Sequence, residues 1–299
     1  MFSLQPRPAT VLNVCTDLAC TAAGASQLCA EVEALLGPGS GARVERSPCL
    51  GLCERAPAAL AIKAGDPVRT AVSAPATVQE AVLAASAPDS AAQEPPAETA
   101  VPQAGQDHLV LLRRVGVVDP SSLDDYRAAG GYTALRRAFE LGPAGVIREV
   151  TDSGLVGRGG AAFPTGRTWQ ATASQPDHPH YLVCNADESE PGTFKDRVIM
   201  EGDPYALVEA MTVAAYATGA HQGFVYLRGE YPRALRRLRH AIEQARARGF
   251  LGEDVLGQGY AFDIEIRRGA GAYVCGEETA LFNSVEGYRG EPRSKPPFP

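Results

Sequence analysis

Four of the seven cysteines form two closely spaced pairs that could bind a metal cluster. Cys15 and Cys20 have four residues between them, Cys49 and Cys53 have three, and 28 residues separate the two pairs. Each pair lies where a predicted strand meets a loop, so the four thiolates can converge. A [2Fe–2S] cluster needs two thiolates for each iron, and two pairs on neighbouring loops supply them at a small cost in chain entropy. The spacing therefore predicts a [2Fe–2S] site.

Other uses of these thiols stay open at this stage. Disulfides or ordinary buried thiols are one alternative, although an odd number of cysteines fits a secreted disulfide framework poorly. A tetrahedral zinc site is another, although zinc loops usually have only two residues between their cysteines. Cys29 falls within a predicted helix beside Leu28, and we expect it to belong to the core.

Residues 157–166 form a glycine-rich stretch that could hold a phosphate. Its glycines let backbone N–H groups approach an anion closely, and Arg158 adds a fixed positive charge. The stretch lacks the Gly-Lys-Ser/Thr end of a P-loop and differs from the glycine pattern that follows a Rossmann strand. Taken alone it is also typical of a plain loop, so its meaning depends on the segments downstream.

An acidic loop at residues 185–197 follows directly after a predicted strand at residues 181–184. The carboxyl ends of strands are where α/β sheets gather ligands. Three carboxylates could accept hydrogen bonds from ribityl or ribose hydroxyls and from flavin ring nitrogens: Asp187, Glu188 and Glu190. The alternative is a solvated acidic turn that is balanced by Lys195 and Arg197.

Residues 269–281 again join glycines to paired carboxylates. Glu277 and Glu278 stand at the start of an apolar helical run. The helix dipole stabilises carboxylates at this end, and the free N–H groups of the first turn can also face a ligand.

The bulk composition places limits on the class of protein. A chain of 299 residues that is 45% hydrophobic and 21% charged is long enough for two globular domains, and a net charge of −7 makes nucleic acid an unlikely partner. No apolar run approaches the roughly 18 residues that span a bilayer, and the first nine residues lack the apolar core of a signal peptide. We therefore expect a cytoplasmic location and no direct membrane insertion.

Residues 87–107 divide the chain into two parts. Pro, Ala, Glu, Gln and Ser dominate this segment, which has almost no large apolar side chains and cannot bury a core. The composition predicts a linker between one domain at residues 1–86 and a second at residues 108–299.

The apolar pattern before the linker predicts a small thioredoxin-like α/β domain. Thr77 and Glu80 have the spacing of a capping box, which opens the last helix of this domain. The expected order is strand, helix, strand, strand and helix, at residues 10–14, 25–36, 58–62, 68–72 and from 77 onward.

The second part also alternates helical and strand patterns, which favours an α/β class. The expected order is helix, strand, helix, strand and helix, at residues 132–141, 181–184, 205–218, 224–227 and 232–248. Six arginines line the last helix, and they could either dock an acidic partner or form a solvated face: Arg233, Arg236, Arg237, Arg239, Arg246 and Arg248.

Residues 9–86 resemble the thioredoxin-like [2Fe–2S] ferredoxins, which include the small cluster-bearing subunit of complex I. That family has Cys-x4-Cys followed by Cys-x3-Cys, and the sequence of residues 47–57 is close to its second half. The resemblance implies that Cys15, Cys20, Cys49 and Cys53 bind the cluster.

Residues 108–299 resemble the NADH-binding flavin subunit of complex I and the diaphorase subunits of NAD-linked hydrogenases and formate dehydrogenases. The match rests on the glycine-rich stretch, the acidic loop, residues 269–281 and the ending at 286–299. It implies that FMN and NADH phosphates meet Gly157, Arg158, Gly159 and Gly160. It implies flavin contacts at Asn185, Asp187, Glu188, Gly276, Glu277 and Glu278, and NAD(H) contacts at Phe163, Glu190, Lys295 and Phe298.

The sequence departs from this family at three points. The family has Lys before Trp after the glycine loop, whereas Thr168 precedes Trp169 here, with Arg167 as a substitute of different shape. An aromatic residue that helps to sandwich adenine is replaced by Ala171, which removes about 1 kcal/mol of stacking. The family also continues into a helical bundle with a [4Fe–4S] cluster, so we expect that cluster only in a longer form and expect this chain to be cut short at its C-terminus.

The resemblance implies an NADH dehydrogenase, or diaphorase, module. Hydride passes from NADH to FMN and single electrons then pass to iron–sulfur centres, with Glu188 and Glu278 as the charges nearest the reaction. The expected partners are the iron–sulfur and catalytic subunits of a formate dehydrogenase, a hydrogenase or an NADH-quinone oxidoreductase, through which the module could sit at the inner face of a membrane. The alternative is a non-catalytic [2Fe–2S] electron-transfer or assembly subunit with a decayed flavin site.

Overall fold

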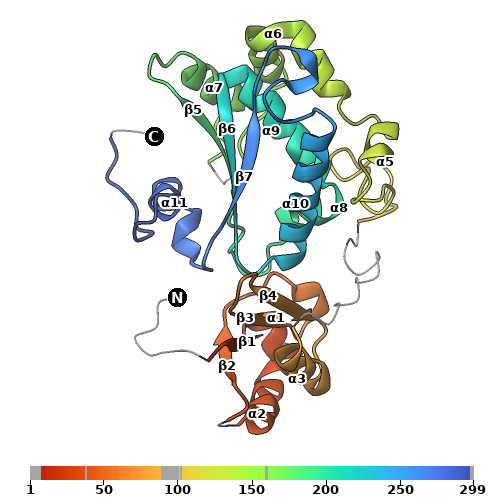
Figure 1. Ribbon diagram of the computed structural model, residues 1–299, viewed down its shortest axis with the longest axis vertical. Helices are drawn as coiled ribbons and strands as arrows, with labels where there is room; N and C mark the ends of the chain where they lie inside the picture. Colours follow the sequence, from red (N-terminus) through yellow and green to blue (C-terminus); the bar gives the residue numbers. More distant parts are fainter. Residues whose placement is uncertain (1–7, 38, 89–100, 102, 159–160, 297–299) are drawn as a thin grey trace.

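The computed structural model describes residues 8–37, 39–88, 101, 103–158 and 161–296. These residues form two parts, each built around its own sheet (Figure 1). The α/β class with an N-terminal thioredoxin-like domain is confirmed. The predicted domain boundaries stay a prediction, and most of the predicted linker, residues 89–100 and 102, lies outside the described residues.

The first part has a four-stranded mixed sheet in the order β2-β1-β3-β4. The central strand β1 is parallel to β2 and antiparallel to β3, and β3 is antiparallel to β4. The elements are β1 (Thr10–Cys15), α1 (Leu18–Ala22), α2 (Ala25–Leu35), β2 (Ala42–Ser47), η1 (Cys53–Arg55), β3 (Ala59–Lys63), β4 (Arg69–Ser73) and α3 (Val78–Ser86). All five predicted elements are present, and α1, β2 and η1 are additional.

Local sequence explains why these elements form where they do. Thr77 accepts a hydrogen bond from the Glu80 amide at 3.3 Å while the Glu80 carboxylate accepts one from the Thr77 amide at 3.1 Å, so the predicted capping box is confirmed. Helix α2 directs Leu28, Cys29 and Val32 into the core beneath β1. Cys29 is fully buried there, as expected of a core residue.

The second part has a three-stranded parallel sheet in the order β5-β6-β7. Its strands are β5 (His180–Ala186), β6 (Ala220–Leu227) and β7 (Asp263–Arg268). Its helices are α5 (Leu123–Ala128), α6 (Thr133–Asp152), α7 (Thr165–Ala173), α8 (Lys195–Gly202), α9 (Pro204–Thr218), α10 (Pro232–Ala247) and α11 (Glu278–Val285), with short turns η2 (Val255–Gly257) and η3 (Tyr273–Gly276).

Helices cover both faces of this sheet. Val225 and Leu227 join the large core that includes α9 and α10, whereas Tyr226 between them packs with Cys275 and Leu281 of the α11 region. Successive side chains of a strand point to opposite faces. Helix α11 therefore lies across the sheet from α9 and α10 (Figure 1).

The arginine-rich helix α10 makes ion pairs within the chain. Arg233 pairs with Glu201 at 3.0 Å, Arg246 with Asp263 at 2.8 Å and Arg248 with Asp124 at 2.8 Å. Part of this arginine set is thus used within the chain, and both interpretations, a solvated face and a docking surface for an acidic partner, stay predictions. Among the described residues, no helix has both the length and the apolar composition that a bilayer crossing requires.

Candidate functional site

The four predicted metal-binding cysteines lie together at one end of the first sheet. Cys15 ends β1, Cys20 lies in α1, and the Cys49 and Cys53 sulfurs are 3.5 Å apart. The Cys15 thiol contacts both Cys20 and Cys49, so the two pairs meet. All seven cysteines are free thiols, which removes the disulfide alternative for this structure.

The arrangement supplies the donors that a binuclear cluster needs. A tetrahedral metal with metal–sulfur bonds of about 2.3 Å keeps its sulfur ligands about 3.8 Å apart, close to the separation of Cys49 and Cys53. Cys15 contacts Cys20 as well as Cys49, so each pair is close together and the two pairs adjoin. Two adjoining pairs of thiols are what two irons with two ligands each require.

The surroundings shift the pKa values of the four cysteines in different directions: hydrogen bonding to Cys15 lowers the pKa of Cys20, whereas the pKa values of the other three are raised. Hydrogen bonding to Cys15 and burial raise the pKa of Cys49 to about 12, and burial raises the pKa of Cys53 to about 11. Metal ligands must be deprotonated, and a bound cation supplies the charge that stabilises them. At Cys49 and Cys53 a bound metal would therefore supply the stabilisation that the thiolates need.

The glycine-rich stretch is a closed loop between α6 and α7. The Gly157 amide donates to the Phe163 carbonyl at 2.8 Å, and a bridge joins Val156 to Pro164. Arg158 and Phe163 are exposed, as phosphate and dinucleotide contacts require. Gly159 and Gly160, which the sequence assigns to the phosphates, lie outside the described residues.

Gly166, the last glycine of this stretch, has a packing role. A Cβ atom at this position would lie 2.2 Å from the Thr151 hydroxyl oxygen and 2.8 Å from the Thr151 Cα, so only glycine lets α7 approach α6 this closely. Two of the three departures from the flavin family fall on the same helix, where Thr168 and Ala171 are both exposed.

Asn185 and Asp187 form the part of the site where β5 ends. The Asn185 amide donates to the Gly276 carbonyl at 2.8 Å and thereby joins the acidic loop to η3. Asp187 is 8% exposed; one carboxylate oxygen accepts from Ser189 at 3.1 Å, and the other is buried without a partner in the described structure. Burial raises the pKa of Asp187 to about 6.

This unpartnered oxygen is the observation that best fits a ligand. Buried polar atoms in folded proteins nearly always have a hydrogen-bond partner, and exceptions with a raised pKa cluster at binding sites. Gly276 lies beside the other oxygen of this carboxylate, because a Cβ atom there would stand 3.3 Å from the oxygen that accepts from Ser189. The geometry suits a hydroxyl or ring N–H donor of the kind that a flavin carries.

Glu188 faces a different direction from Asp187. It is 3% exposed, and its carboxylate accepts hydrogen bonds from the Asp196 amide at 2.8 Å, the Arg197 amide at 3.1 Å and the Tyr231 hydroxyl at 3.0 Å. Both oxygens are thus used to hold the first turn of α8, where the helix dipole favours a negative charge. A direct role for Glu188 at a flavin stays a prediction. Glu190 is exposed further along the loop.

Glu277, Glu278 and Lys295 are brought together from two segments. The Lys295 ammonium pairs with Glu277 at 2.8 Å and contacts Glu278 directly. Glu277 also accepts from the Thr279 and Ala280 amides, both at 2.9 Å, and caps α11. Phe298, the last predicted dinucleotide contact, lies outside the described residues.

Replacing Lys295 by Met is expected to raise the pKa of Glu277 toward its ordinary value of 4.5. Hydrogen bonding to Lys295, followed by that to Thr279, lowers the pKa of Glu277 to about 2. The stabilisation that comes with this depressed pKa is present above pH 4.5 and is lost as the pH falls toward 2. Carbon-13 NMR titration of labelled glutamate measures the change. Lys63→Met is the control, and a Glu277 pKa still near 2 in the Lys295 variant would show that the helix cap alone depresses it.

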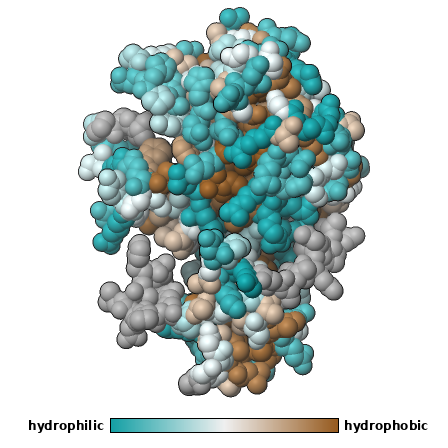
Figure 2. All heavy atoms as spheres, in the orientation of Figure 1, coloured by the Kyte–Doolittle hydropathy of each residue, from teal (hydrophilic) through white to brown (hydrophobic). Residues whose placement is uncertain are grey.

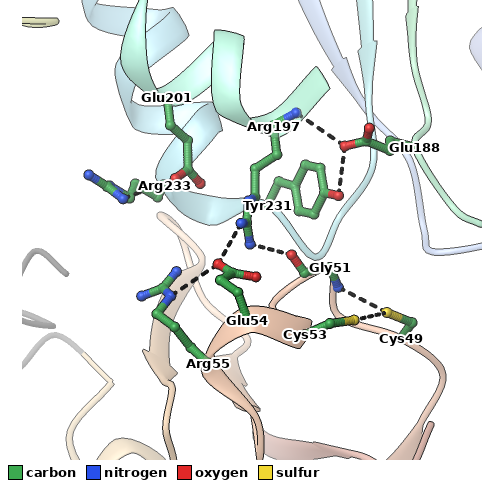
Figure 3. A network of polar contacts seen from close by, with 10 residues as sticks. All are labelled: Cys49, Gly51, Cys53, Glu54, Arg55, Glu188, Arg197, Glu201, Tyr231 and Arg233. Atoms are coloured by element: carbon green, nitrogen blue, oxygen red, sulfur yellow. Dashed lines mark hydrogen bonds and ion pairs between the residues drawn. The ribbon is translucent and has the colours of Figure 1, made fainter. Parts of the chain in front are cut away.

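Two buried arginines that contact the first part could not be recognised from the sequence pattern. Arg197, taken there as a surface counter-charge, is 2% exposed, and Arg228 is 3% exposed. Both reach residues of the first part, as Figure 3 shows for Arg197. Nothing in their local sequence distinguishes them from solvated arginines.

The two parts thus combine a four-cysteine thioredoxin-like domain with an α/β domain whose loops bury a carboxylate oxygen without a partner in the described structure. The family model of the Nuo51 FMN-binding domain matches residues 150–299, and that of the thioredoxin-like [2Fe-2S] ferredoxin matches residues 1–79. The chain therefore belongs to the Nuo51 FMN-binding family and carries a thioredoxin-like ferredoxin domain.

Individual relatives agree with this assignment. The chain is 54% identical over 191 residues to an F subunit of the NADH-quinone oxidoreductase of Rhizobium meliloti (strain 1021), covering 64% of this chain and 45% of the relative. It is 53% identical over 190 residues to the HndC subunit of the NADP-reducing hydrogenase of Solidesulfovibrio fructosivorans, covering 64% and 39%. The chain spans less than half the length of these relatives.

A solved structure matches both parts at once. The air-oxidised NAD+-reducing [NiFe]-hydrogenase has a chain that superposes with a TM-score of 0.72 at 30% identity, covering 99% of this chain and 49% of that one. The superposition therefore covers both parts of this chain within one chain of that protein.

Proposed function

We propose that the chain is an NADH dehydrogenase module that oxidises NADH with FMN and passes electrons to iron–sulfur centres. The observation that carries the proposal is the buried, unpartnered oxygen of Asp187, directly after β5, on a carboxylate whose other oxygen lies beside Gly276. Bound FMN would supply the conversion of two-electron hydride chemistry into one-electron transfer, which amino-acid side chains do not perform.

The residues of the chain have binding and orienting roles in this proposal. Asp187 would accept a hydrogen bond from the flavin, and Asn185 fixes the Gly276 carbonyl so that the two loops keep one geometry. Lys295 holds Glu277 and Glu278 close together and neutralises one of their two charges, so the start of α11 keeps one net negative charge. The loop closed by Gly157 and Phe163 presents Arg158 to phosphates.

The [2Fe–2S] centre belongs to the same proposal. Cys15 and Cys20 would hold one iron, and Cys49 and Cys53 the other, because each pair is adjacent in the fold. We also propose domains at residues 1–86 and 108–299 joined by a linker, and a [4Fe–4S] cluster only in a longer form.

The partners and location follow from the relatives. Subunits of NADH-quinone oxidoreductases and hydrogenases are similar to this chain, which supports a place in a multi-subunit oxidoreductase. We propose further iron–sulfur and catalytic subunits as partners, formate, hydrogen or quinone as the far end of the electron path, and a cytoplasmic location. The fusion of both parts in one chain favours the hydrogenase type over separate complex I subunits.

An anaerobic NADH titration of the purified, reconstituted chain tests the proposal. Visible absorbance is expected to show bleaching of bound flavin, and EPR is expected to show a reduced [2Fe–2S] signal. A chain that binds no flavin but has a cluster reducible by dithionite would contradict the enzyme proposal. That outcome would support the alternative of an electron-transfer protein, which the departures at Thr168 and Ala171 favour.

A further inference from the structure

Two buried arginines of the second part reach the loop that carries Cys49 and Cys53. Arg197 of α8 donates to the Gly51 carbonyl and, at 2.6 Å, to the Glu54 carboxylate (Figure 3). Arg228, which follows β6, donates to the Cys49 carbonyl at 2.7 Å and to the Glu188 carbonyl. Each guanidinium of the second part therefore holds the backbone of residues 49–53, which we call the cysteine loop.

The approach of the two parts also requires a glycine. Gly51 has a φ of +68°, and a Cβ atom there would lie 2.5 Å from the Tyr231 ring. The hydroxyl of the same Tyr231 donates to Glu188 at 3.0 Å. The cysteine loop is thus packed against a side chain that also supports the acidic loop of the flavin site.

The charged groups at this contact are one carboxylate, that of Glu54, and the guanidinium groups that pair with it. Glu54 follows Cys53 directly in the chain and is compensated by Arg197 at 2.6 Å and by Arg55 at 3.4 Å. The second oxygen of Glu54 is buried without a partner in the described structure. Reduction adds a negative charge to a cluster, so a nearby carboxylate opposes it and a nearby guanidinium favours it.

We propose that Arg197 and Arg228 are positioning residues that hold the cysteine loop against the second part of the chain. In the second half of the proposal, the Glu54–Arg197 ion pair sets the reduction potential of the cluster. The second half rests on the proposed function, because it needs a cluster at the four cysteines. Hydrophobic contact between the parts does not explain the arrangement alone, since both guanidinium groups are almost completely buried and bind backbone carbonyls. Figure 2 shows that the visible surface of the molecule is mixed and mostly hydrophilic.

Redox titration of the reconstituted full chain, followed by EPR, tests the ion pair. Arg197→Gln is expected to shift the midpoint potential of the [2Fe–2S] signal to more negative values, and Glu54→Gln to more positive values. The double variant is expected to return close to the parent value. Arg114→Gln is the control, because it removes another partly buried ion pair, with Asp203 at 2.8 Å, within the second part. Shifts of the same sign in both single variants, or none, would overturn the electrostatic role.

Hydrogen exchange tests the docking independently of any cluster. Arg228→Leu and Arg197→Gln are each expected to speed amide exchange in residues 49–55 at least tenfold, whereas Arg114→Gln leaves it unchanged. Unchanged exchange in both variants would overturn the docking role. If the parent chain binds no iron, the proposed cluster function and the role of the ion pair both fail, and exchange still decides whether the arginines dock the loop.

Discussion

Replacing Cys49 by Ser is expected to abolish the [2Fe–2S] signal and to reduce the iron content of the reconstituted chain at least fivefold. The Cys49 sulfur lies between those of Cys15 and Cys53, and it also accepts a hydrogen bond from the Gly51 amide at 3.4 Å. A serine hydroxyl is a poor ligand for cluster iron, which selects soft thiolates. Iron and sulfide analysis together with EPR of the dithionite-reduced chain measure the loss.

The matched control is Cys29→Ala, which removes a fully buried cysteine from the core below the same sheet. This variant is expected to keep the cluster, because Cys29 contacts none of the other cysteines. Bleaching of flavin by NADH is expected to survive in Cys49→Ser to within about threefold, since Asp187 and Gly276 are untouched. Full iron content in Cys49→Ser, or its loss in Cys29→Ala, would show that another ligand set holds the metal.

Elements with a local cause could be predicted from the sequence. The capping box at Thr77 needs only Glu80, and the start of α11 needs only the carboxylate of Glu277 in front of an apolar run. Buried strands such as β1 and β6 show apolar runs because both faces are covered. These features depend on neighbours a few residues away, so pattern analysis finds them.

The missed strands are edge strands with charged side chains. Strand β2 carries Arg43 and Glu45, and β7 carries Glu265 and Arg267. Each strand pairs with one neighbour only and turns much of its surface to solvent, so its apolar pattern is weak. Pairing with β1 and β6 creates these strands, and such long-range pairing leaves little trace in the local sequence.

The residue types of the candidate site could be predicted from the sequence, but the partners toward which the side chains turn could not. Asp187 and Glu188 are adjacent carboxylates, both expected to contact the flavin, yet their hydrogen-bond partners differ. Asp187 keeps an unpartnered oxygen, whereas Glu188 caps α8 and supports the contact with the cysteine loop. The role of Arg197 depends on Glu54, which is 143 residues away in the chain.

Replacing Asp187 by Asn is expected to stabilise the flavin-free second part at neutral pH while weakening FMN binding about tenfold. Burial raises the pKa of Asp187 from an ordinary 3.8 to about 6. Below pH 3.8 the carboxyl is protonated in both folded and unfolded chains. As the pH rises toward 6 the unfolded chain ionises first, so the free energy of unfolding falls. A separation of about two pH units corresponds to a penalty of about 3 kcal/mol above pH 6, which the neutral amide avoids.

Urea unfolding at several pH values measures this effect, because the single tryptophan, Trp169, lies in the second part and reports on its unfolding. The stability gain of Asp187→Asn is expected to be small near pH 3.5 and largest at pH 7. Asp177→Asn, at an exposed carboxylate, is the control and is expected to change stability by less than about 0.5 kcal/mol at either pH. Binding sites keep buried charges at the expense of stability because the ligand later satisfies them. A variant that gains stability at pH 7 and loses FMN affinity therefore assigns Asp187 to the flavin, whereas a loss of stability at pH 7 would assign its carboxylate to the fold.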